Sequence, residues 1–179
     1  SETHYKNGKR EGLTTLWWRS GGKASESHFK NGIINGVSTL WHENGEKEAE
    51  SLVKNGKQEG LATYWYESGI KKEESYFKNG KREGLYTHWY ESGGKNEGHY
   101  KNGKLEGLKT YWYKSGKKQY ETHYKNDRKE LVKGWYETGR KKYLRHYKNR
   151  KENGLRKEWD EDGKLTFQGN FVDGVEEIN

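Results

Sequence analysis

One pattern recurs along the chain with a period of 24 residues, which twice drops to 23, and it restricts the possible folds more than any other feature. Each repeat begins at an Asn, carries a Trp in its eleventh column and a Gly four residues later. The repeats span residues 7–30, 31–54, 55–78, 79–101, 102–125, 126–148 and 149–172. A third column, near the start of each repeat, is Gly except in the sixth, which is one residue short there ("NDRKELVKGW"). Such periodicity predicts a stack of similar structural units.

Each repeat contains two segments in which apolar and polar residues alternate, the pattern of a half-buried β-strand. Ser-Gly or Asn-Gly usually lies between the two segments, and Lys-Asn-Gly-Lys usually separates repeats. Asn-Gly favours a two-residue hairpin turn, because both residues tolerate positive φ. No helical periodicity survives these frequent glycines. We therefore expect an all-β fold: an elongated, single-layer antiparallel sheet, formed as a solenoid-like meander of repeated hairpins with about fourteen strands.

Composition supports a thin sheet rather than a thick core. Only 28% of residues are hydrophobic and 35% are charged, yet the chain has eight Trp and fourteen Tyr, which disordered chains avoid. A repeat array buries aromatic rings between neighbouring units. We expect a single repeat domain over residues 1–179, with a C-terminal tail at 173–179. Residues 1–6 match the second strand of a hairpin, so the array is expected to continue before Ser1.

The consensus "YKNGKxEGLxxxWYxSGKKxxE" resembles the bacterial variant of the MORN repeat, as found in YwqK-type antitoxin proteins. The resemblance covers nearly the whole chain, from Glu2 to about Gly174. It departs locally where the sixth repeat lacks the motif glycine and where Asp160 replaces Tyr in the seventh. The resemblance implies a twisted, single-layer sheet that binds proteins and does not catalyse a reaction.

Alternation divides the first strand of each repeat into two rows. The constant row holds the Trp column, for which we expect a structural packing role: Trp17, Trp41, Trp65, Trp89, Trp112, Trp135 and Trp159. The opposite row varies and is rich in large amphipathic rings, as binding surfaces often are. It provides our candidate partner-binding residues: Trp18, Tyr64, Tyr66, His88, Tyr90, Tyr111, Tyr113 and Tyr136. Shielding of the second side of a thin sheet is the alternative role for this row.

Positive charge is concentrated in the fifth and sixth repeats. Residues 101–152 contain 17 Lys and Arg against 6 Asp and Glu, within a chain of net charge +8. The predicted basic patch comprises Lys117, Lys118, Arg128, Lys129, Arg140, Lys141, Lys142 and Arg145. It favours a protein partner with an acidic surface, because opposite charge speeds encounter and sets register. The alternative is that these lysines only protect turns and edges from aggregation.

No residue pattern indicates catalysis, a metal or a cofactor. Five histidines share one column, His4, His28, His99, His123 and His146, but equivalent residues lie two strands apart, roughly 9.6 Å, too far to share a zinc ion. Glutamates beside the glycine column recur in most repeats, which favours a role in turns or edges. No P-loop, Gly-x-Ser-x-Gly or dinucleotide motif occurs. We predict a non-enzymatic chain with no metal and no cofactor.

The leading hypothesis is a protein-binding scaffold, specifically a cytoplasmic antitoxin or immunity-type protein whose partner is a toxin. The second is an exported surface or envelope protein whose repeats mediate adhesion or spacing, which a signal peptide before Ser1 would favour. The third is single-stranded nucleic-acid binding through aromatics interleaved with Lys. The uneven charge disfavours this third function, since a nucleic-acid groove is basic along its length. No apolar run is long enough for a membrane span.

Overall fold

The all-β prediction is confirmed by the structure, a computed structural model that describes residues 2–178. Every regular element in that range is a β-strand. The chain divides into two compact units, residues 1–91 and 92–179, and each is described by itself. Whether the array acts as the single domain expected from the repeats stays a prediction.

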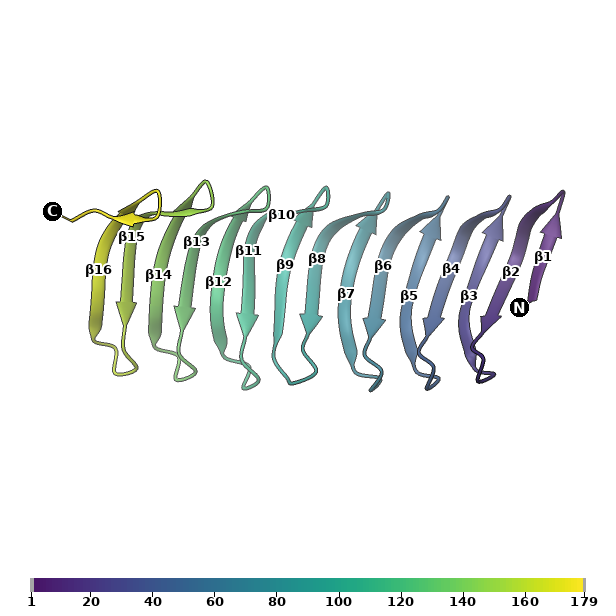
Figure 1. Cartoon of the computed structure of the whole chain (residues 1–179), viewed down its shortest axis with the longest axis horizontal. Coiled ribbons are helices and arrows are strands. Elements are labelled where there is room, and N and C mark those ends of the chain that lie inside the picture. Colours follow the sequence, from purple (N-terminus) through teal and green to yellow (C-terminus); the bar gives the residue numbers. More distant parts are fainter. Residues whose placement is uncertain (1, 179) are drawn as a thin grey trace. The chain divides into compact units, whose positions relative to one another are not determined.

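The first unit is an antiparallel meander in which each strand pairs with the strand that follows it (Figure 1). One layer of strands forms it, and no other part of the unit covers either side. The strands are β1 (Glu2–Lys6), β2 (Lys9–Trp17), β3 (Lys23–Lys30), β4 (Ile33–Trp41), β5 (Lys47–Lys54), β6 (Lys57–Trp65), β7 (Lys71–Lys78) and β8 (Lys81–Trp89). The first strand of the unit, β1, pairs with β2.

The second unit repeats this arrangement with small irregularities. Its strands are β9 (Lys95–Lys101), β10 (Lys104–Leu105), β11 (Gly107–Trp112), β12 (Lys118–Lys125), β13 (Arg128–Trp135), β14 (Lys141–Lys148), β15 (Lys151–Trp159), β16 (Leu165–Val172) and β17 (Val175–Glu176). The described strands outnumber the expected fourteen because β10 and β11 are two parts of one first strand, divided at Glu106, and because β1 and β17 flank the complete repeats. The predicted tail thus contains a short strand, while its last residue lies outside the described range.

The turns between repeats have positive φ at both central residues, as the Asn-Gly signal predicts. At Asn31 and Gly32, for example, φ is +52° and +83°. Both angles lie in the left-handed region, which defines the type I′ turn that matches the twist of a hairpin. Two turns place a larger residue where the others have Gly: Asp127 at +63° and Arg150 at +69°. An L-residue is strained in that conformation.

The turns within repeats follow the Trp column and use the second glycine column. In the first repeat the Trp18 N–H donates to the Gly22 carbonyl at 2.8 Å, and the Gly21 N–H donates to the Trp18 carbonyl at 3.1 Å. Gly21 has a φ of +92°. The strand pairing shifts register between Leu16 and Trp17, next to this turn. The same bulge precedes the Trp of most repeats, so turn and bulge together set the position of each Trp.

The pairing register gives each unit two faces. We call the side that carries the Leu, Thr and Trp columns the Trp face; Leu13 and Thr15 lie on it, opposite His28 and Glu26 of β3. The other side, the Tyr face, carries Tyr64 in the first unit, opposite Ala49 of β5. In the second unit it carries a stacked Tyr pair, Tyr111 opposite Tyr120.

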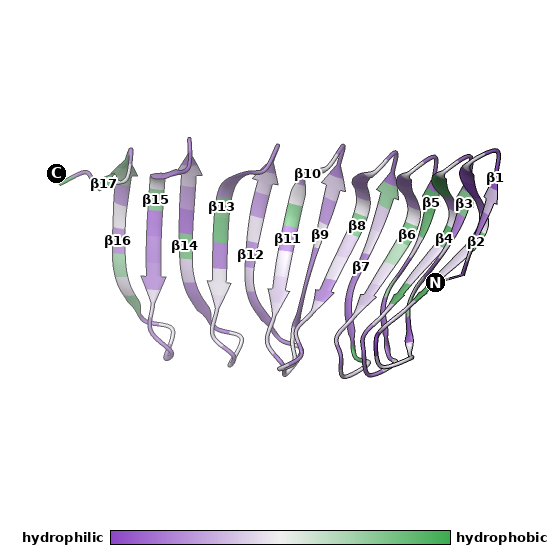
Figure 2. Cartoon of the chain, turned by 45° about the vertical axis from the view of Figure 1, so that its right-hand side comes forward, coloured by the Kyte–Doolittle hydropathy of each residue, from purple (hydrophilic) through white to green (hydrophobic). Residues whose placement is uncertain are grey.

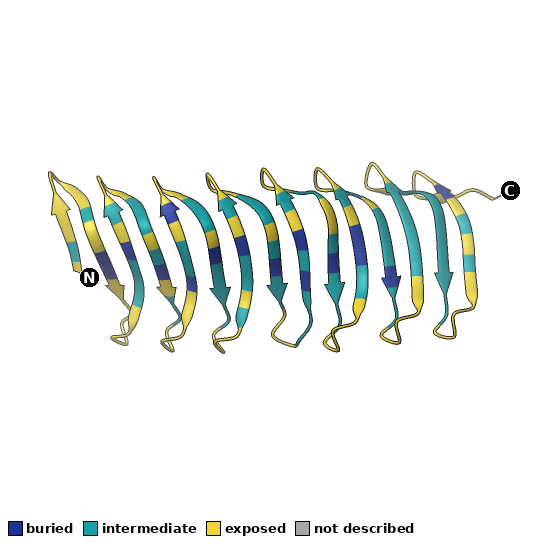
Figure 3. Ribbon diagram, turned by 180° about the vertical axis from the view of Figure 1, so that it is seen from behind, coloured by how far each residue is buried: buried dark blue, intermediate teal, exposed yellow. Residues whose placement is uncertain are grey.

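The buried residues form a thin band along the middle of the strands and are mostly small (Figure 3). Ala62 and Ser75, paired on the Tyr face, are 1% and 0% exposed. On the Trp face, Thr15 and Thr87 are buried between the Leu and Trp columns. No strand is hydrophobic along its whole length (Figure 2). The sheet therefore gains little from a core and depends on contacts between neighbouring repeats.

Candidate binding surfaces

In five repeats, the residue that follows the column Trp bonds to the backbone of the next repeat. The hydroxyl of Tyr66 donates to the Trp89 carbonyl at 3.0 Å, and the hydroxyl of Tyr136 donates to the Trp159 carbonyl at 2.8 Å. Three more members of the column make the equivalent contact: Trp18 Nε1 with Trp41 O at 3.2 Å, His42 Nε2 with Trp65 O at 3.1 Å, and Tyr113 Oη with Trp135 O at 3.0 Å. We call these contacts the Tyr clamps. Each fixes one repeat to the next through a single polar atom.

The predicted binding row therefore divides into two groups. Trp18, Tyr66, Tyr113 and Tyr136 use their polar atoms in the Tyr clamps, so only the sides of their rings are available to a partner. The remaining members lie on the Tyr face or beside it. The rings of His88 and Tyr90 meet edge to face with centroids 4.8 Å apart, and Tyr111 stacks on Tyr120 at 4.0 Å. The prediction that this row binds a partner stays a prediction.

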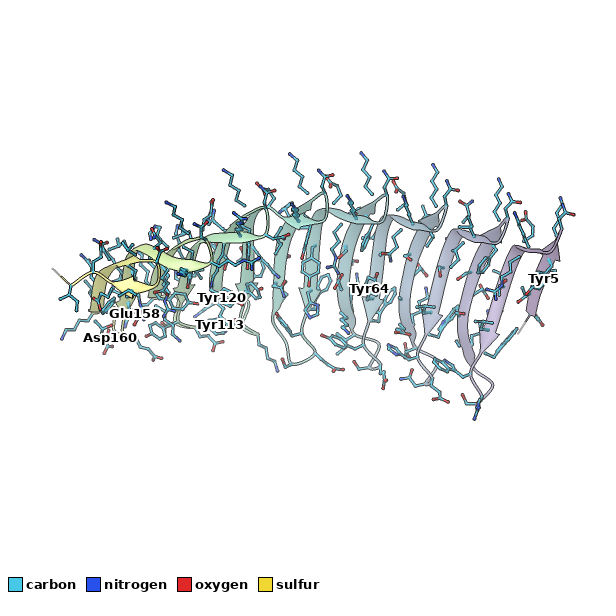
Figure 4. The ribbon with its side chains drawn as sticks, turned by 45° about the horizontal axis from the view of Figure 1, so that its top comes forward. Tyr5, Tyr64, Tyr113, Tyr120, Glu158 and Asp160 are labelled. Carbon is cyan, nitrogen blue, oxygen red and sulfur yellow. The ribbon has the colours of Figure 1, made fainter. Side chains whose placement is uncertain are left out.

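Tyr64 lines a hollow of about 320 Å³ on the Tyr face of the first unit. Figure 4 shows Tyr64 on this unit and Tyr113 and Tyr120 on the second. The Tyr64 hydroxyl accepts a hydrogen bond from Gln58 Nε2 at 2.9 Å. The other lining residues are His42, Glu48, Trp65, Lys72, Glu73 and Arg82. Arg82 pairs with Glu73 at 2.5 Å, so the hollow contains a neutralised ion pair.

The Trp column contacts the neighbouring repeat through lysine rather than through another ring. Lys23 Nζ lies 5.6 Å from the ring centroid of Trp41, and it also pairs with Glu26 at 2.7 Å. The arrangement recurs in later repeats, with Lys47 over Trp65, Lys71 over Trp89, Lys95 over Trp112, Lys118 over Trp135 and Lys141 over Trp159. Cation–π contact holds each Lys in place, and five of the six, Lys23, Lys47, Lys71, Lys95 and Lys118, also pair with a glutamate. Sequence reasoning had assigned several of these lysines only to turns or to a basic patch.

Sequence reasoning missed a stripe of exposed apolar side chains on the Trp face of the first unit. Cross-strand pairing joins Val37 to Leu52 and Leu61 to Tyr76. We call the following set the apolar stripe: Leu13, Val37, Leu52, Leu61, Tyr76 and Leu85. Their exposed fractions run from 37% for Leu13 to 50% for Tyr76. A Leu opposite a His occurs in both units, as Leu13 opposite His28 in the first and Leu108 opposite His123 in the second. The signal that could have revealed the stripe is the histidine column of the second strand, where Leu52 and Tyr76 replace His in two repeats.

The structure separates the predicted basic patch into three places. Lys117, Lys118, Arg140, Lys141 and Lys142 lie at the turns within repeats, whereas Arg128 and Lys129 begin β13 beside the turn between repeats. Arg145 lies in the middle of β14. The turns within repeats lie at one end of the strands, and the turns between repeats lie at the other end. Residues that are close in sequence therefore lie at opposite ends of the strands.

Arg145 belongs to a network of two arginines and two glutamates on the Tyr face of β14 and β15. It pairs with Glu158 at 2.8 Å and Glu152 at 3.7 Å, while Arg156 pairs with the same carboxylates at 2.7 and 3.3 Å. Burial alone would raise the pKa of the Glu158 carboxyl, but hydrogen bonds and charge pairing with Arg156 and Arg145 outweigh burial and lower it. Arg145 is therefore neutralised within the sheet and adds little to a basic surface. Burial likewise raises the pKa of the neighbouring Tyr143 hydroxyl, which stays protonated.

Three of the glutamates beside the glycine column, Glu11, Glu59 and Glu106, bond to turns, which confirms the expected turn or edge role for these three. Glu59 Oε2 accepts the Asn79 N–H at 2.8 Å, and the Gly80 N–H donates to the Gln58 carbonyl at 2.9 Å. Glu11 and Glu106 accept the N–H of Asn31 and Asn126 in the same way, each at 2.8 Å. We call this pair of bonds the turn clasp. It attaches the turn of one repeat to the first strand of the repeat before it.

One hollow of the second unit lies beside β13, where the sixth repeat lacks its glycine. Its volume is about 480 Å³. We call it the basic hollow, and its lining residues are Lys104, Lys125, Asn126, Arg128, Lys129, Glu130, Tyr147, Lys148 and Asn149. Five of these side chains are cationic and one is acidic. Arg128 and Lys129 are the only residues of the hollow that the sequence had placed in the basic patch.

Within residues 2–178, no group of three or more His, Cys, Asp or Glu side chains is arranged to hold a metal ion. Among the same residues, no helix is long and apolar enough to cross a membrane.

Three segments match the family model described as the MORN repeat variant: residues 58–79, 105–126 and 152–173. Each begins at the same point of its repeat, in the first strand, and ends at the turn residue of the next repeat. No curated protein matches the chain. The matches support the assignment of the observed hairpins to MORN-variant repeats, a non-catalytic type of repeat that generally mediates interactions with proteins or membranes.

Proposed function

We propose that this chain, a protein of MORN-variant repeats, is a non-enzymatic scaffold that binds another protein through one face of its sheet. The single observation that carries the proposal is the apolar stripe. Val37 pairs with Leu52 and Leu61 pairs with Tyr76 across neighbouring strands, and clustered exposed apolar side chains of this kind commonly mark an interface. The stripe lies on a framework fixed by Tyr clamps and turn clasps, so a partner would bind a largely preformed surface.

The partner that fits best is a protein with an apolar strip and an acidic surface. The chain has a net charge of +8, and most of its excess positive charge lies in residues 101–152. Opposite charge on the partner would speed encounter, while burial of the stripe would supply affinity. The predicted row of Tyr, His and Trp residues is a second candidate surface on the opposite side.

The more specific proposal is an antitoxin or immunity-type role, in which the scaffold occludes a toxin in the cytoplasm. Its support is the resemblance of the repeats to those of YwqK-type antitoxins, together with a basic chain suited to an acidic partner. Coexpression with the protein encoded by the neighbouring gene tests this role. Protection of the host by the wild-type chain is the expected result, and toxicity unchanged by the chain would contradict it.

The binding surface can be tested with matched pairs of substitutions on the two faces. Leu61→Gln with Leu85→Gln changes the apolar stripe, whereas Leu16→Gln with Leu40→Gln changes equally exposed leucines on the Tyr face. With the purified partner, the first pair should weaken binding by about tenfold or more and the second should have little effect. Equal binding by all three proteins would contradict a role for the stripe.

A further inference from the structure

In the regular repeats, a carboxylate of the chain itself occupies the space between successive Asn turns. The hollow lined by Lys54, Asn55, Lys57, Glu59 and Asn79 has a volume of about 290 Å³. Its one acidic residue, Glu59, accepts the N–H of Asn79 at 2.8 Å. The equivalent hollow of the fifth repeat, about 380 Å³, holds Glu106, which accepts the N–H of Asn126. A carboxylate bound to a turn N–H between lysines is thus a recurring contact of this fold.

The basic hollow lacks this contact. Without the glycine, β13 reaches its Trp one residue early, and its pairing with β12 shifts by a single residue between His123 and Tyr124. Glu130 lines the hollow but makes no hydrogen bond or ion pair with the described part of the chain. Within that part, neither bond of the turn clasp forms at Asn149 and Arg150. The next turn, at Asp173, forms one of the two bonds of the turn clasp: the Gly174 N–H donates to the Glu152 carbonyl at 2.9 Å.

Positive charge exceeds negative charge around the vacant contact, with five cationic side chains and one acidic side chain, Glu130. Lys104, Lys125, Arg128, Lys129 and Lys148 line the hollow, and none of them forms an ion pair with the residues that the structure describes. Arg145, by contrast, is neutralised by Glu152 and Glu158. Like charges held close together repel one another, and an external anion would relieve that repulsion.

We propose that the basic hollow is a receptor for Glu or Asp side chains of an acidic peptide segment. This inference rests on the proposed function, since it assigns the acidic part of a protein partner to a site. An external carboxylate would take the place that Glu59 and Glu106 occupy in their own repeats, on the N–H of Asn149, with the lysines and Arg128 around it. Charge-assisted hydrogen bonds of this kind are among the stronger polar contacts.

Nucleic acid fits the hollow less well than an acidic peptide. Single strands bind through aromatic rings with free faces on which bases stack. The only aromatic residue lining the hollow is Tyr147, and Lys129 Nζ lies 3.9 Å from the centroid of its ring. One face of that ring is therefore covered. A local cluster of cations, rather than a long basic groove, suits a short acidic segment.

The decisive variant inserts one glycine between Glu130 and Leu131, which restores the regular repeat "NDRKEGLVKGW". We expect Glu130 then to reach the Asn149 N–H and to close the receptor from within. Titration of the whole chain with capped hexaglutamate should show binding that weakens by about tenfold or more on insertion. Adding Glu130→Ala to the insertion should restore much of the binding, because the internal hydrogen-bond acceptor is removed together with its charge.

Substitutions that leave the backbone length unchanged provide the second arm. Lys129→Gln should weaken hexaglutamate binding, whereas Lys57→Gln, at the occupied hollow of another repeat, should not. Hexaglutamine, which carries no charge, should bind none of these chains. Equal hexaglutamate affinity for the wild-type, insertion and Lys129→Gln chains would overturn the proposal, as would tighter binding of an oligothymidine that displaces the peptide. The peptide titration needs no natural partner. Failure of hexaglutamate to bind would therefore count against the basic hollow, whereas unchanged partner binding by the Leu61→Gln and Leu85→Gln chain would count against the apolar stripe.

Discussion

Hydrogen bonds made by single polar atoms at the boundaries between repeats stabilise the stacking of this chain. A layer with few large buried side chains cannot rely on a thick apolar core. Each Tyr clamp instead satisfies a backbone carbonyl with one side-chain polar atom, a hydroxyl in Tyr66, Tyr113 and Tyr136, and each turn clasp satisfies a turn N–H with one carboxylate. Small changes at these atoms should therefore have measurable effects on stability.

Replacement of Tyr66 by Phe removes one clamp and keeps the ring. The hydroxyl that donates to the Trp89 carbonyl is lost, and the free energy of unfolding should fall by about 1 kcal/mol. Tyr76→Phe is the matched control. Tyr76 is 50% exposed, and its hydroxyl makes no hydrogen bond with the described residues. Urea denaturation measures both. A loss of equal size in the two variants would contradict a structural role for the clamp.

Arg150→Gly should stabilise the chain. Arg150 has a φ of +69° in a turn where most repeats place Gly, and relief of that strain should raise the free energy of unfolding by about 1 kcal/mol. Gly80→Ala, at a φ of +76° with only ordinary contacts around the new Cβ, should lower it by a similar amount. Thermal or urea unfolding at neutral pH gives both values. Destabilisation by the Arg150 change would mean that its side chain has a favourable contact outweighing the strain.

At the scale of elements, the pairing of β14 with β15 differs from that of the other hairpins because it carries the network of Arg145, Arg156, Glu152 and Glu158. The folded pKa of Glu158 lies below its ordinary value of 4.5. Its stabilising contribution is therefore complete above that value and is lost as pH falls through the folded pKa. The hairpin should depend on acidity more than hairpins joined by neutral contacts.

Glu158→Gln isolates this effect. At pH 7 the variant should be less stable than the wild-type chain, because Arg145 and Arg156 lose an ionised partner. The difference should shrink as pH falls from 4.5 through the lower folded pKa of Glu158, where the carboxyl of the folded wild-type chain becomes protonated. Unfolding free energies measured between pH 7 and pH 3 give the comparison, with exposed Glu161→Gln as the control. A difference independent of pH would contradict the assigned role of the charge.

At the scale of the whole molecule, the fold was predictable from local turn chemistry. The candidate site was harder to predict, because it depends on contacts between repeats. Asn-Gly pairs and a fixed Trp column specify hairpins and their period within a few neighbouring residues. The Tyr clamps depend on the register of two successive repeats, so Tyr66 was read as a binding residue without its bond to Trp89. Arg145 was counted as free charge because its partners lie on the next strand.

Salt dependence should separate the two contributions to partner binding. Added salt screens the charge of the chain, so the association rate with an acidic partner should fall between low and physiological ionic strength. The dissociation rate should change less, because it depends more on burial of the apolar stripe. Surface-based kinetic measurements at several salt concentrations give both rates. An association rate that does not respond to salt would contradict the expected acidity of the partner.

The claim that this scaffold binds a protein through its apolar stripe is tested most directly by methyl NMR. The chain, labelled at Leu and Val methyl groups, is titrated with the purified partner. Shifts or broadening centred on Val37, Leu52, Leu61 and Leu85 are the predicted result. Changes confined to Leu16 and Leu40 on the opposite face, with the stripe unaffected, would contradict the claim.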